Sequence, residues 1–230
     1  MRQDEKFQIL SRVPLFSSLG ESEIQSLAAI VTERNFRTGE TMFFESDSPD
    51  WFYIVADGMV EILKHSSAGK DFVITLLGAN EIVGEVAIVD GAPYPATARA
   101  RVDTQTLAIK RTDLTAFLMR NPQLLLRINI MLGARLRDVQ MRLSGFAIEK
   151  AGQRLIRILL MLQLKCGSTI PFTRQEIADM TGITTETTTR IISQLKKRGI
   201  IGSTRGRIVI LDHDQLKQLD ENPVQPSISL

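Results

Sequence analysis

The side chains best suited to specific chemistry lie between residues 185 and 198, where the residue pattern predicts a helix. Glu186 and Arg190 are four residues apart, so they share one face of that helix. An arginine can donate two hydrogen bonds to guanine O6 and N7, and a glutamate can accept one from cytosine N4. The alternative is a plain surface ion pair, which stabilises a helix by ~0.3–0.5 kcal/mol. The neighbouring elements decide between the two interpretations.

Two predicted helices and a tight turn position this pair. Thr173 and Glu176 have the capping-box spacing that begins a first helix, and Gly182 can supply the positive φ of the turn. A second helix is predicted from about Thr185 to Arg198. Its inward-facing apolar residues are Ile191, Ile192 and Leu195. Two helices joined by a short turn that contains glycine form the helix-turn-helix pattern, which favours base reading over an ion pair.

Residues 199–210 follow as a predicted hairpin with a basic tip at Arg205 and Arg207. We expect this hairpin to lie near a DNA backbone as the wing of a winged helix-turn-helix. The threonines of the second helix can meet bases, whereas Thr173, Arg174 and Gln175 can hold phosphates. The predicted DNA contacts are Thr173, Arg174, Gln175, Thr184, Thr185, Glu186, Thr189, Arg190, Lys196 and Arg205.

The charge of the chain agrees with a basic module at its C-terminal end. The 230 residues carry a net charge of +2, which by itself does not suggest nucleic acid. Residues 1–145 carry 16 basic and 18 acidic side chains, and residues 146–230 carry 12 and 8. The asymmetry indicates a near-neutral first part joined to a basic binding part, although chance variation of a few charges stays open.

Short apolar runs with turn signals fill residues 35–110 and predict an antiparallel, jelly-roll-like β-roll. Residues 7–31 are predicted to be helical, and helix returns at Arg111. The fold class is therefore α+β: an N-terminal β-roll, a long helix and a C-terminal winged helix-turn-helix. The predicted domains are residues 1–120, a dimerisation helix and hinge over 121–145, and 146–230.

A long helix is predicted from Asn121-Pro122 to about Ser144, where Ser144-Gly145 breaks the pattern and marks the hinge. Its apolar positions recur in steps of 3, 4, 4, 3 and 4, which resembles a coiled-coil seam. The predicted dimer interface consists of Leu125, Ile128, Leu132, Leu136, Val139 and Leu143. Packing of this helix on its own β-roll is the alternative, and both can hold.

Composition narrows the function classes. Hydrophobic residues make up 43% and charged residues 23% of the chain, which is ordinary for a globular protein. No apolar run is long enough for a membrane helix, no signal peptide is visible, and there is one cysteine, Cys166, so we expect a cytoplasmic protein. No metalloprotease, P-loop, serine-hydrolase or clustered metal-ligand motif is present, so we expect neither an enzyme nor a metal site.

The order of these parts resembles the CRP/FNR family of bacterial transcription regulators over about residues 10–212. The matching segments are 51–58 (WFYIVADG), 84–88 (GEVAI), 173–178 (TRQEIA) and 187–191 (TTTRI). The resemblance implies a homodimer that binds a roughly palindromic operator, contacts RNA polymerase and senses a signal through its β-roll. The pattern Glu186-x-x-Thr189-Arg190 looks closer to the FNR-type Glu-x-x-Ser-Arg than to the cAMP receptor, which implies half-sites with a GA core, tending toward TTGA.

The implied effector pocket departs from the cAMP-binding pattern of that family. Gly84-Glu85 matches the family's ribose-contacting Gly-Glu, but Tyr94-Pro95 stands at the phosphate-clamping Arg-Ser and Val139-Gln140 at the adenine-contacting Thr-Ser. Without the arginine, the charge-assisted contact that offsets burial of a phosphate is missing, so cAMP binding in the usual mode is not expected. The implied pocket residues are Gly84, Glu85, Val86, Ala87, Tyr94, Pro95, Ala96, Val139 and Gln140.

The identity of an effector stays open at this point. A cyclic nucleotide bound in another mode, haem, a different small molecule, or no effector at all are the alternatives. An iron–sulfur cluster is excluded, because the chain has one cysteine. Each of the two histidines, His65 and His213, is expected to be a solvated surface residue.

Overall fold

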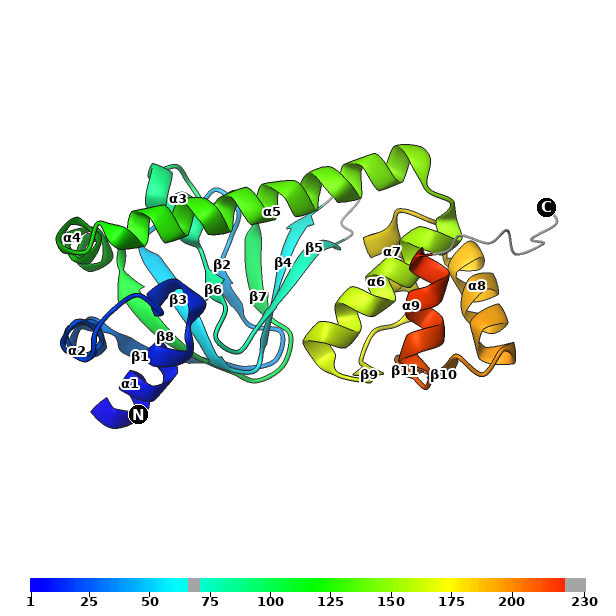
Figure 1. Cartoon of the computed structure of the whole chain (residues 1–230), viewed down its shortest axis with the longest axis horizontal. Helices are drawn as coiled ribbons and strands as arrows, with labels where there is room; N and C mark the ends of the chain where they lie inside the picture. Colours follow the sequence, from blue (N-terminus) through cyan, green and yellow to red (C-terminus); the bar gives the residue numbers. More distant parts are fainter. Residues whose placement is uncertain (66–70, 222–230) are drawn as a thin grey trace. The chain divides into compact units, whose positions relative to one another are not determined.

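The computed structural model describes residues 1–65 and 71–221, except for the side chains of residues 88, 142 and 146–148. The chain divides into two compact units, Met1–Leu136 and Arg137–Leu230, which we call the roll unit and the helix-turn-helix unit. The α+β fold class predicted from the sequence is confirmed, and the antiparallel roll lies in the first unit (Figure 1).

Two four-stranded antiparallel sheets build the roll unit. The first has the order β1-β8-β3-β6 and the second β2-β7-β4-β5. The strands of the first are β1 (Thr32–Phe36), β8 (Thr104–Lys110), β3 (Trp51–Asp57) and β6 (Ile82–Val83). Those of the second are β2 (Thr41–Phe43), β7 (Thr97–Ala100), β4 (Met59–His65) and β5 (Asp71–Gly78). One apolar cluster, which includes Tyr53, Val60 and Ala98, joins the two sheets.

The other face of the first sheet is covered by helices, as Figure 1 shows for α1 and α2 beside β1 and β8. The helical elements of this unit are α1 (Gln3–Arg12), a 3₁₀ turn (Pro14–Phe16), α2 (Glu21–Ile30), α3 (Glu85–Asp90), α4 (Arg111–Arg120) and the first part of α5 (Gln123–Ile148). Residues 7–31 are mainly helical, as predicted, and contain the end of α1, the 3₁₀ turn and α2. Helix α1 ends before Pro14, because proline has no amide hydrogen and the residue before it is held extended.

Helix α5 also extends further than the sequence pattern indicated. It continues through Ser144 and Gly145 to Ile148, and the Glu149 amide still donates to the Gly145 carbonyl at 2.9 Å. The predicted break at Ser144-Gly145 is thus wrong, because a single glycine weakens a helix by about 1 kcal/mol without ending it. The division into residues 1–120, 121–145 and 146–230 stays a prediction.

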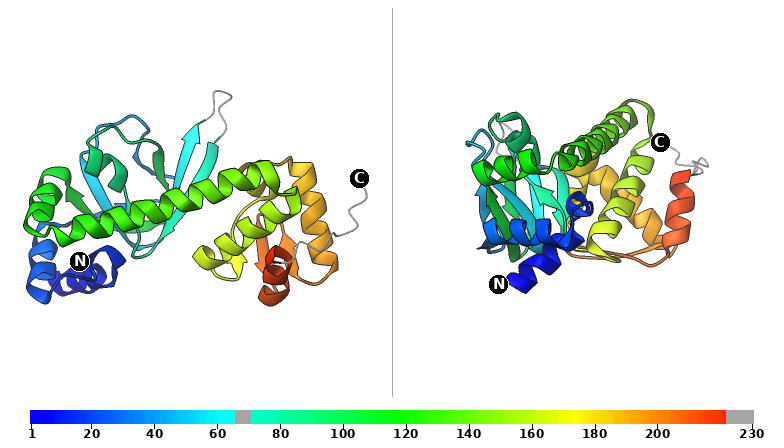
Figure 2. Two further views of the ribbon diagram at one scale, coloured as in Figure 1. Left: turned by 45° about the horizontal axis from the view of Figure 1, so that its top comes forward. Right: turned by 60° about the vertical axis from the view of Figure 1, so that its left-hand side comes forward.

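The helix-turn-helix unit combines a helical core with a three-stranded sheet of order β10-β11-β9. Beyond α5 its elements are α6 (Ala151–Cys166), β9 (Thr169–Ile170), α7 (Arg174–Thr181), α8 (Thr185–Lys197), β10 (Ile201–Thr204), β11 (Arg207–Ile210) and α9 (His213–Glu221). Helices α7 and α8 pack against each other, gold and orange in Figure 2. The hairpin expected over 199–210 is confirmed as β10 and β11.

Candidate functional site

Helix α7 begins as the sequence predicted. The Thr173 amide donates to Glu176 Oε2 at 2.7 Å, and Thr173 Oγ1 accepts from the Glu176 amide at 3.2 Å. This capping box satisfies two backbone groups that a helix start otherwise leaves open. Gly182 ends α7 with φ +64°, the left-handed conformation that the tight turn requires. The local signals for the first helix and the turn are therefore confirmed.

Helix α8 has one buried and one exposed face. Thr184 caps its start by accepting a hydrogen bond from the Thr187 amide at 3.2 Å. The buried side carries Thr188, Ile191, Ile192 and Leu195. Glu186 and Arg190 are exposed, and neither has an ion-pair partner in the described part of the chain. The surface ion pair between them, considered above, does not form, so both groups remain available to a ligand.

The remaining candidate contacts from α7, the end of α8 and the wing are brought together in this unit. Arg174 Nη2 lies 3.4 Å from Ser203 Oγ, and Lys196 Nζ lies 3.5 Å from the Ser203 carbonyl oxygen. Both basic side chains thus reach strand β10. Arg205 is exposed at the hairpin tip, and Thr189 is half-buried on α8. Basic and hydroxyl groups from three elements therefore lie in one unit, as a nucleic-acid interface requires.

Gln175 is engaged within the protein rather than free. Its Nε2 donates to Asp179 Oδ1 at 2.8 Å, and its Oε1 accepts from Thr185 Oγ1. The sequence offered only a phosphate contact for Gln175. The bond to Thr185 crosses from α7 to α8, and no residue spacing indicates it.

In the roll unit, Glu85 is buried and paired. Gly84, with φ +89°, precedes α3, and Glu85 at the start of α3 is 5% exposed. The Glu85 carboxylate forms an ion pair with Arg135 of α5, whose Nη2 also lies 3.4 Å from the Ile82 carbonyl oxygen. Burial lowers the pKa of Arg135, against the opposing effect of nearby Glu81. Glu85 is therefore already used by a side chain of the same unit.

Tyr94 fills the interior beside Gly84. It is 3% exposed, and its ring stacks on Phe43 with centroids 3.6 Å apart. Its hydroxyl donates to the Trp51 carbonyl at 2.5 Å and accepts from the Trp51 amide at 3.2 Å. A Cβ placed on Gly84 would come within 3.1 Å of the Tyr94 ring. Burial raises the pKa of Tyr94 to about 12, so this hydroxyl stays neutral at ordinary pH.

The other implied pocket residues do not form one lining. Ala87 and Ala96 are buried, whereas Val86 and Pro95 are exposed. Val139 and Gln140 are exposed residues of the helix-turn-helix unit, so the roll unit by itself does not contain them. The Tyr94 ring lies beside Gly84, and Arg135 is paired with one oxygen of the Glu85 carboxylate, so the groups that the family pattern assigns to a nucleotide already have partners within the roll unit.

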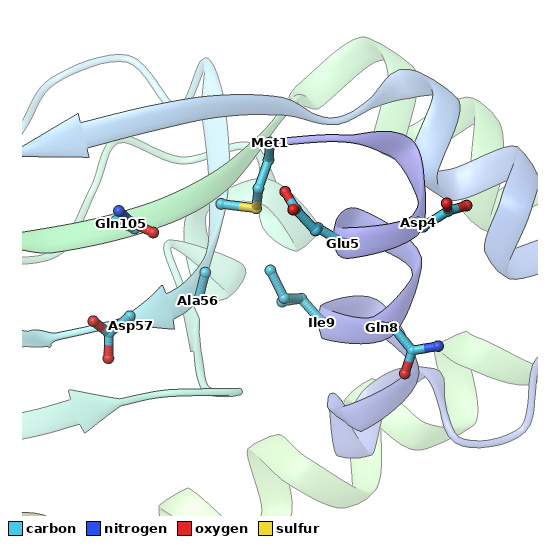
Figure 3. Close-up of a pocket in the computed structure, with 8 residues that line it drawn as sticks. All are labelled: Met1, Asp4, Glu5, Gln8, Ile9, Ala56, Asp57 and Gln105. Atoms are coloured by element: carbon cyan, nitrogen blue, oxygen red, sulfur yellow. The ribbon is translucent and has the colours of Figure 1, made fainter.

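A pocket in the roll unit lies elsewhere, between α1 and the ends of β3 and β8 (Figure 3). It is lined by Met1, Asp4, Glu5, Gln8, Ile9, Ala56, Asp57 and Gln105. Hydrogen bonds from Arg2 hold the pKa of Glu5 below its usual value. None of the residues implied for the effector belongs to this pocket, and the sequence did not indicate it.

The predicted seam of α5 is divided between two surroundings. Ile128 is 5% exposed and belongs to the core of its own roll unit, and Leu132 packs against that core. Leu125, Leu136, Val139 and Leu143 are exposed, the last by 69%. The alternative of packing on the chain's own roll thus holds for the first part of the helix, and the remaining leucines and valine leave an apolar stripe uncovered.

Both histidines are exposed and bonded to neighbouring side chains. His65 Nδ1 lies 2.7 Å from Asp71 Oδ1, and His213 Nδ1 lies 2.8 Å from Gln163 Oε1. Neither points to a haem site. Within residues 1–65 and 71–221, no three His, Cys, Asp or Glu side chains are grouped to hold a metal ion. No helix among the described residues is long and apolar enough to cross a membrane.

Comparison with known proteins assigns both parts of the chain. Residues 33–121 match the cyclic nucleotide-binding domain, and residues 153–219 match the Crp-like helix-turn-helix domain. A cyclic AMP receptor protein of Thermus thermophilus is 27% identical over 90% of this chain and 96% of its own. The nitrogen fixation regulation protein FixK of Bradyrhizobium diazoefficiens is 27% identical over 88% of both chains. The structure of FixK2 from Bradyrhizobium japonicum superposes with a TM-score of 0.72 at 25% identity, covering 83% of this chain and 98% of that one.

A β-roll of the cyclic nucleotide-binding type followed by a winged helix-turn-helix defines a DNA-binding transcription regulator, not an enzyme. The chain belongs to the CRP/FNR family of transcription regulators.

Proposed function

We propose that the protein acts as a homodimer that binds palindromic operators and reads each half-site with α8. The observation that carries this proposal is the exposed face of α8, where Glu186 and Arg190 have no partner among the described residues. An unpaired arginine and glutamate one turn apart suit the guanine and the cytosine of one G·C base pair. Together with the resemblance of Glu186-x-x-Thr189-Arg190 to the FNR-type pattern, this supports a half-site in which that guanine belongs to a GA core, tending toward TTGA.

Binding-site selection from random duplex DNA tests this proposal. We expect enriched sequences with two GA-containing half-sites related by two-fold symmetry, spaced for two recognition helices. The affinity should fall steeply with salt, because several Lys and Arg contacts to phosphate release counterions. Enrichment of sites without GA in the half-site contradicts the assignment of Glu186 and Arg190.

The apolar stripe of α5 supports the dimer. Leu125, Leu136, Val139 and Leu143 leave exposed apolar groups at coiled-coil spacing, which a second copy of the helix would cover. Leu136→Asp is expected to dissociate the dimer in sedimentation experiments. Ile130→Asp is the matched control, because Ile130 is 61% exposed on the same helix but lies off this stripe.

We also propose that DNA binding does not require cAMP. The buried Tyr94 ring and the Glu85–Arg135 pair support this, since both occupy groups that a nucleotide would need. Calorimetry with cAMP is expected to show no binding at micromolar concentration, and operator affinity should be the same with and without it. Micromolar or tighter binding coupled to DNA affinity overturns this part. Contact with RNA polymerase and a cytoplasmic location stay predictions.

A further inference from the structure

A glutamine ties the first turn of α8 to α7 and uses both ends of its amide group. Gln175 Nε2 donates to Asp179 Oδ1 at 2.8 Å, and Gln175 Oε1 accepts a hydrogen bond from Thr185 Oγ1. Thr185 is the first residue of α8 and stands beside the exposed Glu186. A short chain of polar groups therefore runs from the Asp179 carboxylate to the start of the recognition helix.

The Asp179 carboxylate sets the direction of both hydrogen bonds that Gln175 makes. An ionised carboxylate can only accept, so the amide nitrogen of Gln175 must face Asp179. The amide oxygen then faces Thr185, and because an amide oxygen can only accept, Thr185 donates its single hydroxyl hydrogen. Thr185 keeps its methyl group and its oxygen lone pairs for another partner, but it has no hydrogen left to donate.

Because its hydroxyl hydrogen is already donated to Gln175, Thr185 can accept hydrogen bonds from bases in the major groove but cannot donate any. Its methyl group suits the thymine C5-methyl, and its oxygen can accept from adenine N6 or cytosine N4. Guanine offers only the acceptors N7 and O6 there. An A·T pair therefore satisfies both parts of the side chain, whereas a G·C pair offers one donor and no methyl group.

We infer that Gln175 is a positioning residue for sequence reading: by holding the Thr185 hydroxyl, it makes Thr185 distinguish A·T from G·C at one position of each half-site. The inference rests on the proposed function, because it requires α8 to lie in the major groove. Without Gln175 the hydroxyl rotates freely and can donate to guanine, so the distinction is lost.

Competition binding with the full-length protein tests the inference. Thr185→Ala identifies the base pair that Thr185 contacts, as the position whose preference it removes. At that position the unmodified protein is expected to favour A·T over G·C by about fivefold or more, as for a single contacted base pair. Gln175→Ala should reduce this preference to about twofold or less, while the positions read by Glu186 and Arg190 keep theirs.

Two further variants separate positioning from a general effect. Thr185→Val retains methyl groups but has no hydroxyl, so Gln175→Ala should change nothing further in that background. Asp179→Asn removes the group that fixes the amide direction, so it should relax the preference as well. Gln194→Ala is the matched control, because Gln194 is an exposed glutamine of α8 whose side chain makes no hydrogen bond within the described residues.

Two outcomes with the variants would contradict the role inferred for Gln175. If Gln175→Ala weakens binding to all four base pairs by the same factor, Gln175 is a phosphate contact and the inference is wrong. It is also wrong if Thr185→Ala alters no base preference. If the unmodified protein selects no sequence at all, the proposed function fails and the inference fails with it. The binding-site selection experiment, done with the unmodified protein, therefore separates this outcome from a failure of the inference alone.

Discussion

The two compact units each contain a glutamate and an arginine that could pair, and they use them in opposite ways. In the roll unit, Glu85 is buried and paired with Arg135. In the helix-turn-helix unit, Glu186 and Arg190 are exposed and unpaired among the described residues. A buried charge without a partner is strongly destabilising, whereas an exposed one stays hydrated and available. The same residue types therefore hold one unit together and leave the other open to a ligand.

The aromatic and hydroxyl groups follow the same division. Tyr94 has its ring stacked and its hydroxyl bonded twice inside the roll. The α8 face keeps side chains at its surface that its own fold does not need. We therefore expect substitutions in the roll to change stability first, and substitutions on α8 to change DNA binding first.

The largest expected effect comes from emptying the roll interior. Tyr94→Ala removes a buried aromatic ring and should destabilise the roll unit by about 3–5 kcal/mol. The measurement is denaturant unfolding, with Tyr94→Phe as the control that keeps the ring and loses only the hydroxyl bonds. If the Tyr94→Ala protein is as stable as the Tyr94→Phe protein, the roll is not filled by this ring.

The next effect compares the two arginines directly. Arg135→Met leaves Glu85 buried without its partner and should lower the free energy of unfolding by about 3 kcal/mol. Arg190→Met removes an exposed, unpaired charge and should change stability by less than about 0.5 kcal/mol. Thermal unfolding of the two variants under identical conditions measures both. Equal losses of stability contradict the division between the units.

For DNA binding, in contrast to stability, substitutions on α8 are expected to have the larger effect. Arg190→Ala should reduce the free energy of operator binding by about 1–3 kcal/mol and relax the choice of base at one position. Lys196→Ala should weaken all sequences alike and lower the salt dependence, because a lysine at the rear of α8 suits a phosphate. Titrations of a selected operator and a mutated one with each variant test this. If the Arg190→Ala protein loses the same binding free energy on both operators, Arg190 contacts the DNA phosphates and does not read a base.

Local signals made much of the fold predictable from the sequence. The capping box of Thr173 and Glu176, the turn at Gly182 and the alternating strands depend on neighbouring residues, and the structure confirms them. One local signal misled, because Gly145 does not end α5. Helix α9 was not predicted, although Asp212, which accepts from the Gln215 amide at 2.9 Å, is a standard N-cap signal.

The site was predictable only where residue type and helix face were sufficient. Glu186 and Arg190 follow from their spacing on α8. The Glu85–Arg135 pair depends on packing between α3 and α5, and no residue spacing in the sequence indicates it. The Gln175–Thr185 bond depends on the rotamers of two side chains on different helices. Such contacts come from tertiary packing, which residue spacing does not encode.

The smallest effect is a pH dependence confined to the roll unit, because the only two tyrosines, Tyr53 and Tyr94, lie there. Burial raises the pKa of both, that of Tyr94 to about 12 from an ordinary value near 10. Above pH 10 the unfolded chain therefore loses a proton that the folded chain keeps, so stability falls as the pH rises. At pH 11 Tyr94 should account for a loss of about 1.4 kcal/mol. Subtracting the unfolding free energies of the Tyr94→Phe protein isolates this contribution, since lysines titrate alike in both proteins. A difference that stays constant from pH 9 to pH 11 would show that the Tyr94 hydroxyl is solvated, and the contrast between a filled roll and an open recognition helix would then lose its strongest support.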